Sequence, residues 1–390
     1  MKKQKFSTIA EKNRIIDSIL YAIMLRNKFL LLGHQNPDED CIASLVSFAL
    51  LLRKFDKTAV ICVGNEIHEH YGYLLSICRY NSISFHFSGD KFEKSDFDTI
   101  VICDTPKLSM IDGCEGVQEL FKDKDVVKIE IDHHIGADSE YIGDPGYCLV
   151  NEASSACELI GLLCLKLMKR AEILKRYQIP EVFSRNLVLS ILTGIIGDSK
   201  MGQFLKSRRE KKYYEIFSNL YSNLLAKKTV KATNFSDKTE VFEELGRLSH
   251  REGNCFNYMM GKKRFSKSIG YVALNEKDME QLCREECESD TIVTVSRAVA
   301  DILAEESGIL SMVAYYDKPD HSNLVQFRIR RSAQYKNFDL RLLLNLFAIE
   351  NGGGHQGAIG FRIPKDNIED FEAYITRLIS GIEGAIAPRG

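Results

Sequence analysis

The sequence predicts an α/β fold, with a parallel-sheet domain joined by a helical linker to a smaller α/β domain. In the first half of the chain, short aliphatic runs alternate with helical patterns. A charged stretch follows, and a second set of strands and helices fills the rest of the 390 residues. Strands that alternate with helices are typical of a parallel sheet. The length itself favours two or three domains.

The first half contains four apolar runs that predict buried strands, at 28–34, 58–64, 98–105 and 126–134. Their β-branched and aliphatic side chains suit a sheet that is covered on both faces. Apolar spacing predicts helices at 41–55, 154–170 and 185–199, the second of them opened by a serine cap.

The second half begins with a different composition. Residues 205–240 are charged and helical in pattern, and the run KSRREKK at 206–212 is typical of a solvated helix face. Beyond them we expect a helix near 291–306 and strands at 268–275, 309–317 and 324–332, and this second α/β unit ends in the stretch 351–363. The expected domains are therefore 1–204 and 245–390, with a helical connector at 205–244.

Composition narrows the class of protein. No apolar run reaches about 18 residues, and the basic N-terminus lacks a following apolar segment, so we expect neither a membrane partner nor a secretory signal. A net charge of −2 does not favour wrapping of long nucleic acid. Eleven scattered cysteines indicate buried free thiols in the cytoplasm. A homodimer is left open.

Polar side chains gather at the ends of the predicted strands and in the turn after a buried helix. In open parallel sheets, ligands bind beyond the carboxyl ends of the strands. Separate stretches can therefore converge there. The residues concerned are His34, Asp38, Asp40, Asp104, Asp132, His133, His134 and Asp198.

Each residue alone has an ordinary explanation. Asp38 or Asp40 could cap a helix, and Asp104 could belong to a turn. Together, however, several carboxylates in one crevice require a cation. Mixed Asp and His ligands without Cys suit Mn²⁺, Fe²⁺, Co²⁺ or Mg²⁺ better than a structural Zn²⁺. Two such ions about 3.5–4 Å apart would activate a water and clamp phosphate oxygens.

Four stretches, HQNPDED, CDTPK, IDHH and TGIIGDSKMGQF, resemble in order the four motifs of the DHH phosphoesterase family. GGGHQGAIG, with IRRS upstream, resembles the signature of the DHH-associated C-terminal domain. The resemblance covers nearly the whole chain and is weakest at 205–240. Glu39 stands where relatives commonly have Gly, and Ala358-Ile359 where they have Ala-Ala; neither change removes an expected ligand.

The resemblance implies a site with two divalent ions, of which Mn²⁺ is the first choice and Mg²⁺ or Co²⁺ the alternatives. Asp104 would bridge the ions. His134 would contact the scissile phosphate, and Asp132 would orient the imidazoles. The implied ligands are His34, Asp38 and Asp198 for the first ion, and Asp40 and His133 for the second.

In the second domain, the resemblance implies a grip on the substrate away from the ions. Glycines allow close approach of the backbone to an anion; without His355 and the family context, a flexible turn would be the favoured explanation. The implied residues are Arg331, Ser332, Gly352, Gly353, Gly354 and His355.

The expected activity is hydrolysis of short oligonucleotides, or of linear dinucleotides such as pApA and pGpG, to mononucleotides. Removal of phosphate from 3′-phosphoadenosine 5′-phosphate is a second expected activity. The alternatives are a RecJ-type exonuclease on single strands, a cyclic-di-AMP phosphodiesterase, and a nucleotide-sensing protein that binds without turnover. Polyphosphatase relatives carry a different C-terminal domain and are disfavoured.

Overall fold

The computed structural model describes residues 2–386 except 65–66, 88–89, 91–92, 112–115, 137, 227–234, 236, 247–249, 285–286, 288, 318–321, 337 and 350. The chain forms two compact units, Met1–Arg247 and Leu248–Gly390. Both are α/β, which confirms the predicted fold class. Among the described residues, no helix combines the length and the hydropathy that crossing a bilayer requires.

The first unit is built on a six-stranded sheet in the order β3-β2-β1-β4-β5-β6. Every pairing is parallel. The strand order changes direction between β1 and β4, which makes their carboxyl ends the topological switch point of the sheet. The strands are β1 (Lys28–Leu32), β2 (Thr58–Val63), β3 (Ser84–Phe87), β4 (Thr99–Cys103), β5 (Val127–Asp132) and β6 (Cys148–Val150).

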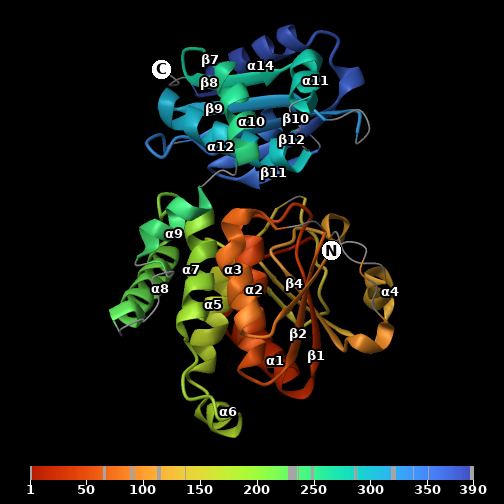
Figure 1. The fold of residues 1–390 in the computed structure, drawn as a ribbon, viewed down its shortest axis with the longest axis vertical. Helices are drawn as coiled ribbons and strands as arrows, with labels where there is room; N and C mark the ends of the chain where they lie inside the picture. The colour runs from red at the N-terminus through yellow and green to blue at the C-terminus, as the bar shows by residue number, and fades with distance from the viewer. Residues whose placement is uncertain are drawn as a thin grey trace. The chain divides into compact units, whose positions relative to one another are not determined.

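The side chains of β1 alternate between the two faces of this sheet, and apolar clusters cover both faces. Phe29 and Leu31 belong to a large apolar cluster on one face, whereas Leu30 and Leu32 belong to a smaller cluster that includes α4 (Val117–Lys122). Figure 1 shows the larger helices on one side of the sheet and α4 on the other. Those helices are α1 (Ile9–Leu25), α2 (Glu39–Arg53), α3 (Gly72–Tyr80), α5 (Ala156–Leu167) and α7 (Arg185–Ser199).

The segment expected as a connector packs onto the first unit. It forms α8 (Arg208–Ala226), which contacts α7, and α9 (Lys238–Leu245). Phe217 and Tyr221 of α8 are fully buried in the larger cluster of the first unit. Between its charged residues, this segment carries apolar residues at helical spacing, which form a stripe along one side of the helix. The short helix α6 (Ala171–Arg176) lies between α5 and α7 in the chain.

The second unit contains a mixed sheet in the order β11-β12-β10-β9-β8-β7, with β8 and β9 parallel and the other pairs antiparallel. The stretch 351–363 contains a hairpin of two strands. The strands are β7 (Arg264–Phe265), β8 (Ile269–Leu274), β9 (Leu310–Tyr316), β10 (Leu324–Arg331), β11 (Gly352–His355) and β12 (Ala358–Pro364).

Two apolar clusters flank this second sheet. One lies under α10 (His250–Gly261), α11 (Glu276–Arg284) and α12 (Ser289–Ser307). The other lies under α13 (Arg341–Leu346) and α14 (Phe371–Ile386). In β10 the burial alternates strictly, so that Val325, Phe327 and Ile329 enter the second cluster and their neighbours face the opposite side.

The cysteines require one correction. Nine of them among the described residues are free thiols, as expected, and all but Cys283 are buried. Cys62, which was expected to be free as well, is disulfide-bonded.

Candidate metal centre

The expected ligands follow the carboxyl ends of three neighbouring strands. His34 follows β1, Asp104 follows β4, and His133 and His134 follow β5. Asp104 has a φ of 50°, a left-handed conformation, and its backbone N–H donates to the carbonyl of Ile131 on β5. The turn after β4 is thereby held against β5, which brings the Asp104 side chain toward the two histidines.

The N-terminus of α2 supplies two more carboxylates. Asp38 is the N-cap of α2, and its Oδ1 accepts from the Cys41 N–H at 3.3 Å. Capping and metal binding are compatible, because a carboxylate has two oxygens. Asp40 is completely buried and accepts hydrogen bonds from the backbone N–H groups of Ala156 and Cys157 at the start of α5. That positive helix end stabilises the buried carboxylate.

Two glycines of α7 allow this approach of α2. A Cβ added at Gly194 would lie 2.4 Å from Asp40 Oδ1, and one at Gly197 would lie 2.6 Å from the Cβ of Glu39. Any larger residue at these positions would push the first turn of α2 away from α7. Glu39, the departure from the family pattern, therefore packs across Gly197. The sequence analysis missed this role of the two glycines.

The Nε2 atoms of His34 and His133 point into a group of carboxylates. His133 Nε2 lies 3.2 Å from Asp104 Oδ1, 3.3 Å from Asp198 Oδ2 and 3.8 Å from Asp40 Oδ2. His34 Nε2 lies 3.7 Å from both Asp38 Oδ1 and Asp104 Oδ2. The Nδ1 atoms face backbone carbonyls instead, those of Gln35 at 2.7 Å and Ala153 at 3.3 Å. These second contacts fix the orientation of both rings.

This geometry fits a divalent cation. Two ligand atoms at about 2.0–2.2 Å from one ion lie about 3–3.5 Å apart, close to the separations around His133. Asp104 Oδ1 is buried and has no hydrogen-bond partner among the described residues. Three overlapping groups of side chains could hold an ion: Asp40, His133 and Asp198; Asp104, His133 and His134; and His34, Cys41 and Asp104. Asp198 thus groups with His133, whereas the resemblance implied that Asp198 binds the same ion as His34.

Protons compensate the excess of negative charge when no ion is bound. Burial and the neighbouring Asp104 carboxylate raise the pKa of Asp40 well above its usual value. Burial also raises the pKa of Asp198, despite the opposing effect of His133. Burial alone would lower the pKa of His133, but Asp104 and Asp198 raise it well above the usual value. A cation that binds to these groups would displace their protons.

Asp132 and His134 form a pair beside these ligands, and His134 Nδ1 also lies 3.5 Å from Asp104 Oδ1. Asp132 Oδ1 lies 2.8 Å from His134 Nδ1, and burial of the carboxylate is outweighed by His134 and Lys3, which lower its pKa. His134 is the more open of the two histidines, with 36% of its side chain exposed against 14% for His133. Because Nδ1 faces Asp132, Nε2 is the atom available to a substrate.

Lys3 completes this pair and was missed by the sequence analysis. Its ammonium is fully buried and contacts Asp132 Oδ2, Glu130 Oε1 at 2.7 Å and the Thr105 carbonyl at 2.6 Å. Glu130 in turn accepts from the N–H groups of Ile142 and Gly143. A lysine in a basic N-terminal run carries no signal of burial, so only the fold reveals it.

Arg331 and Ser332, expected to bind substrate, lie in a network within the second unit. Arg331 is 6% exposed and donates to the carbonyls of Lys336 and Phe338. Ser332 is fully buried and donates to Glu305 Oε2 at 3.0 Å. Both side chains are thus engaged in holding the turn after β10. Their role toward a substrate stays a proposal.

The glycine run forms β11 and ends in the expected histidine. Gly354 has a φ of 139°, and a Cβ there would lie 2.2 Å from the Ala358 carbonyl oxygen, so this position requires glycine. His355 Nδ1 accepts from the Gly357 N–H at 3.2 Å. The structure therefore brings Gly352, Gly353, Gly354 and His355 together on one edge strand.

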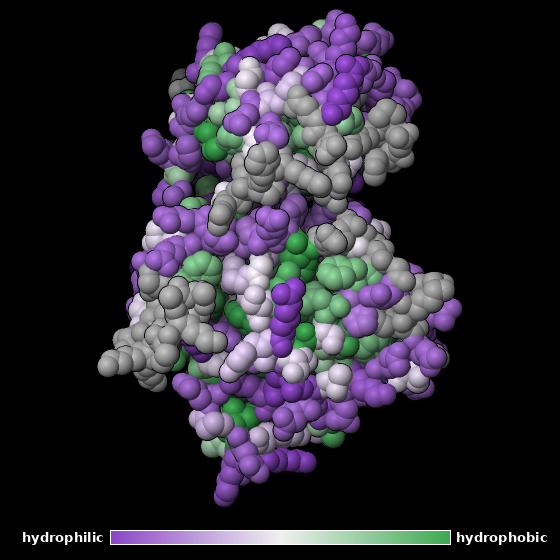
Figure 2. All heavy atoms as spheres, viewed as in Figure 1, coloured by the Kyte–Doolittle hydropathy of each residue, from purple (hydrophilic) through white to green (hydrophobic). Residues whose placement is uncertain are grey.

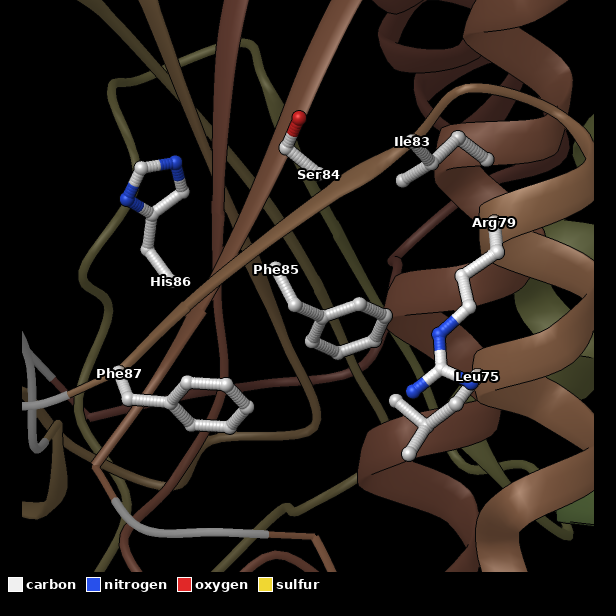
Figure 3. Close-up of a pocket in the computed structure, with 7 residues that line it drawn as sticks. All are labelled: Leu75, Arg79, Ile83, Ser84, Phe85, His86 and Phe87. Carbon is white, nitrogen blue, oxygen red and sulfur yellow. The ribbon is translucent and has the colours of Figure 1, made fainter.

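A cavity of about 430 Å³ lies elsewhere, beside the edge strand β3. Arg79 and Leu75 of α3 approach Phe85 and Phe87 of β3 there, as Figure 3 shows. None of the expected ligands lines it, and no carboxylate is among its lining residues. The expected metal ligands therefore lie at the strand ends and not in this cavity.

Comparison with known proteins agrees with this arrangement. The model of the DHH family, N-terminal domain, matches residues 28–195, and the DHHA1 domain model matches residues 280–381. No curated protein matches the chain.

Among solved structures, an exopolyphosphatase-related protein from Bacteroides fragilis has a TM-score of 0.64 at 17% identity, over 95% of this chain and 96% of that one. This likeness shows a shared fold. Weaker matches include the pGpG-specific phosphodiesterase PggH from Vibrio cholerae, with a TM-score of 0.33 at 13% identity over 91% of this chain and all of that one. RecJ in complex with Mn²⁺ from Thermus thermophilus has a TM-score of 0.43 at 12% identity, over 97% of this chain and 56% of that one.

Proposed function

Because this chain belongs to the DHH family and carries a C-terminal DHHA1 domain, it is a phosphoesterase, and we propose that it cleaves short oligonucleotides. The proposed substrates are oligonucleotides of two to five residues, including the linear dinucleotides pApA and pGpG, and the products are mononucleotides. Hydrolysis of 3′-phosphoadenosine 5′-phosphate is proposed as a secondary activity of the same site.

The buried cluster of carboxylates and imidazoles carries this proposal. Four carboxylates with two imidazoles would have a formal charge of −4 if the imidazoles were neutral, which two divalent ions would neutralise. The residues that would hold the ions are His34, Asp38, Asp40, Asp104, His133 and Asp198. When bound, such ions supply charge to the phosphoryl oxygens and lower the pKa of the attacking water; Mn²⁺ is the ion we propose first.

His134 would act on the phosphate itself. Its Nδ1 is held by Asp132 at 2.8 Å, so Nε2 can donate a hydrogen bond to a phosphoryl oxygen where negative charge develops. Asp132 would keep the ring in this orientation. The buried Lys3 would hold Asp132 in turn.

The DHHA1 domain supports a short substrate. We propose that His355 and the glycine strand Gly352–His355 contact an anionic group of the nucleotide that is not cleaved. Arg331 and Ser332 would contribute indirectly, by holding the turn after β10.

The test is a substrate panel on purified protein with excess Mn²⁺. It comprises pApA, pGpG, strands of five and twenty-five nucleotides, 3′-phosphoadenosine 5′-phosphate and cyclic-di-AMP, each with a His134→Ala control. We expect fast release of mononucleotides from the shortest substrates and no release by the control.

Other outcomes of this panel would favour a different function. Preference for the longest strand would replace the proposal with a RecJ-type exonuclease, and preference for cyclic-di-AMP with a cyclic-dinucleotide phosphodiesterase. Tight dinucleotide binding without any product over hours would overturn hydrolysis of these substrates and favour a nucleotide-sensing protein.

A further inference from the structure

A thiol lies beside one of the two expected ion positions. Cys41 is fully buried in the first turn of α2, directly after Asp40. Its Sγ, a ring nitrogen of His34 and a carboxylate oxygen of Asp104 all lie within 4.8 Å of one another. The sequence analysis counted Cys41 only among the buried free thiols, so this proximity to two expected ligands is a finding of the structure.

The residue before His34 leaves room for this sulfur. A Cβ added at Gly33 would lie 2.3 Å from Cys41 Sγ and 3.3 Å from Leu45 Cδ1. Any side chain at position 33 would therefore have to displace the sulfur. Because Gly33 follows β1 directly and precedes His34, the thiol packs against the backbone that positions an expected ligand.

The separations around His34 suit an ion that is bound through nitrogen, oxygen and sulfur. His34 Nε2 lies 3.7 Å from both Asp38 Oδ1 and Asp104 Oδ2. Around a tetrahedral ion with bonds of about 2.0–2.3 Å, neighbouring ligand atoms lie about 3.3–3.8 Å apart. Since Cys41 Sγ is within 4.8 Å of the other two ligand atoms, a movement of about 1 Å would bring it into such a shell.

The ion position of His133 differs in this respect. Among the described residues, the groups around His133 that could hold an ion contain only carboxylates and imidazoles. Cys157 is fully buried beside this position, but its Sγ donates to the backbone carbonyls of Asp40 and Ser190, at 3.9 and 3.8 Å. One position therefore has a thiol near the expected ligands, whereas the thiol beside the other is engaged by the backbone.

We propose that Cys41 is a sulfur ligand at the position of His34 and Asp104, and that this position selects thiophilic divalent ions such as Zn²⁺, Co²⁺ or Cd²⁺ over Mn²⁺. Thiolate ligands favour such ions, whereas carboxylates suit Mn²⁺. On binding, the thiol releases its proton to solvent, and the sulfur donates the electron pair of its new bond to the ion. The proposal rests on the proposed function in taking His34 and Asp104 as ligands.

A sulfur ligand at one position makes the two halves of the centre unequal. The position of His133, with carboxylate and imidazole ligands, retains its preference for Mn²⁺. In a mixture of the two ions, Zn²⁺ would therefore bind beside Cys41 and Mn²⁺ beside His133. Zn²⁺ affinity, measured by competition with a chromophoric chelator, should decrease by about tenfold or more in Cys41→Ser, and Mn²⁺ affinity should stay within about threefold.

The central test follows sulfur ligation by absorption. Metal-free full-length protein is titrated with Co²⁺ in the absence of oxygen, because a thiolate bound to Co²⁺ gives an intense charge-transfer band in the near ultraviolet that nitrogen and oxygen ligands do not give. The weaker visible bands of Co²⁺ report binding at either position. We expect the charge-transfer band in the parent protein and its loss in Cys41→Ser and Cys41→Ala, with visible bands retained in both.

Other thiols are controlled in two ways. Cys157→Ser removes a second buried thiol of the same unit and should leave the charge-transfer band unchanged. The surface of the second unit is mainly hydrophilic on the face that Figure 2 shows, but among the described free cysteines Cys283 of α11 is exposed. Because an exposed thiol can bind Co²⁺ by itself, Cys283→Ser is the parent protein of all these variants. Thermal unfolding identifies any variant that does not fold.

Loss of the charge-transfer band in both Cys41 variants, with its retention in Cys157→Ser, would support the proposal. An equal band in Cys41→Ser, or bound Co²⁺ without this band in the parent protein, would overturn it and leave the centre of carboxylates and imidazoles standing. Absence of any Co²⁺ binding would contradict the centre itself. If the Cys41 variants do not fold, cadmium NMR of the parent protein decides, because a chemical shift typical of oxygen and nitrogen ligands alone would overturn the proposal.

Discussion

Two buried groups of charged residues, one in each unit, differ in how their charges are satisfied. In the first unit, the His34 and His133 imidazoles lie 3.2–3.8 Å from four carboxylates, those of Asp38, Asp40, Asp104 and Asp198. In the second, Arg331 donates to two carbonyls and Ser332 to Glu305.

The difference distinguishes a group of residues that binds an external partner from a group that supports the fold. A buried polar group costs free energy unless it is paired, so groups that the protein pairs internally stabilise the fold. Four carboxylates that share one crevice with two imidazoles instead leave an excess of negative charge, which a cation from outside would neutralise. We therefore propose the strand ends of the first unit as a binding site, whereas the Arg331 network holds a turn. The substitutions below test this distinction.

The largest effect should come from Asp104→Ala. Asp104 lies between His34 and His133, so its removal should disturb both ions, and we expect a loss of activity beyond the roughly 10–100-fold typical of outer partners of a metal site, on the order of 10³-fold. Initial rates on pApA with saturating Mn²⁺ measure it. Full metal-dependent activity of this variant would show that Asp104 is not a shared ligand.

Next is His134→Ala. Because this ring is held by Asp132 and is more exposed than His133, we expect a decrease in kcat of about 10²–10³-fold, the range of positioned acids and of donors to developing charge. Mn²⁺ affinity, measured by calorimetry, should change little. Loss of Mn²⁺ binding in parallel with activity would make His134 a ligand instead.

Lys3→Met should act through Asp132. The loss of its ammonium leaves two buried carboxylates without their cation, and we expect kcat to fall about tenfold with KM within about twofold, as for outer partners of a metal site. In a His134→Ala background the same substitution should have almost no further effect on kcat.

Lys128→Met provides the matched control. Lys128 is 7% exposed, lies on the same strand as Asp132, and donates to the Asp123 carbonyl at the opposite strand end. Its replacement should alter stability but neither kcat nor KM. Equal losses of kcat in the Lys3 and Lys128 variants would indicate that Lys3 serves only the fold.

Arg331→Met tests the comparison in the second unit. The substitution leaves two carbonyls without their donor, so the free energy of unfolding should decrease by about 2 kcal/mol. Urea denaturation measures this, and RNA affinity of the folded variant in EDTA should remain within about threefold, because the guanidinium is engaged internally. Lost RNA affinity at unchanged stability would place Arg331 in the substrate site.

The smallest expected effect concerns pH. Asp40, Asp198, His34 and His133 have raised pKa values, so the metal-free fold holds protons that an ion must displace. Raised pKa values stabilise the folded state at low pH, and this contribution is lost as pH rises through them. Added Mn²⁺ should therefore raise the melting temperature more at pH 8 than at pH 6. An equal or opposite shift would separate ion binding from these groups.

The sequence predicted the part of this site that lies at strand ends. Apolar runs followed by Asp or His locate the carboxyl edge of a parallel sheet, and α7 begins and ends where the apolar pattern indicated. Contacts between segments that are distant in the sequence could not be predicted from the sequence. Nothing local distinguishes Lys3, which is buried, from Lys2, which is exposed, or Gly194, which admits Asp40, from an ordinary helical glycine.

The second unit was harder to predict for a related reason. On β10, Arg328, Arg330 and Arg331 look equivalent in sequence, and only the alternation of the strand and the turn at 336–338 decide which guanidinium is engaged internally. The connector was likewise misleading, because its charged residues cover one face of α8 while Phe217 and Tyr221 are buried on the other.

The most direct test of the central claim is the number and coupling of bound ions. Metal-free protein is titrated with Mn²⁺ by calorimetry, and electron paramagnetic resonance is recorded on the saturated sample. The account predicts two ions per chain, about 3.5–4 Å apart and magnetically coupled, with the coupling lost in Asp104→Ala. A single uncoupled ion, or no tight binding, would contradict a dinuclear site at these strand ends.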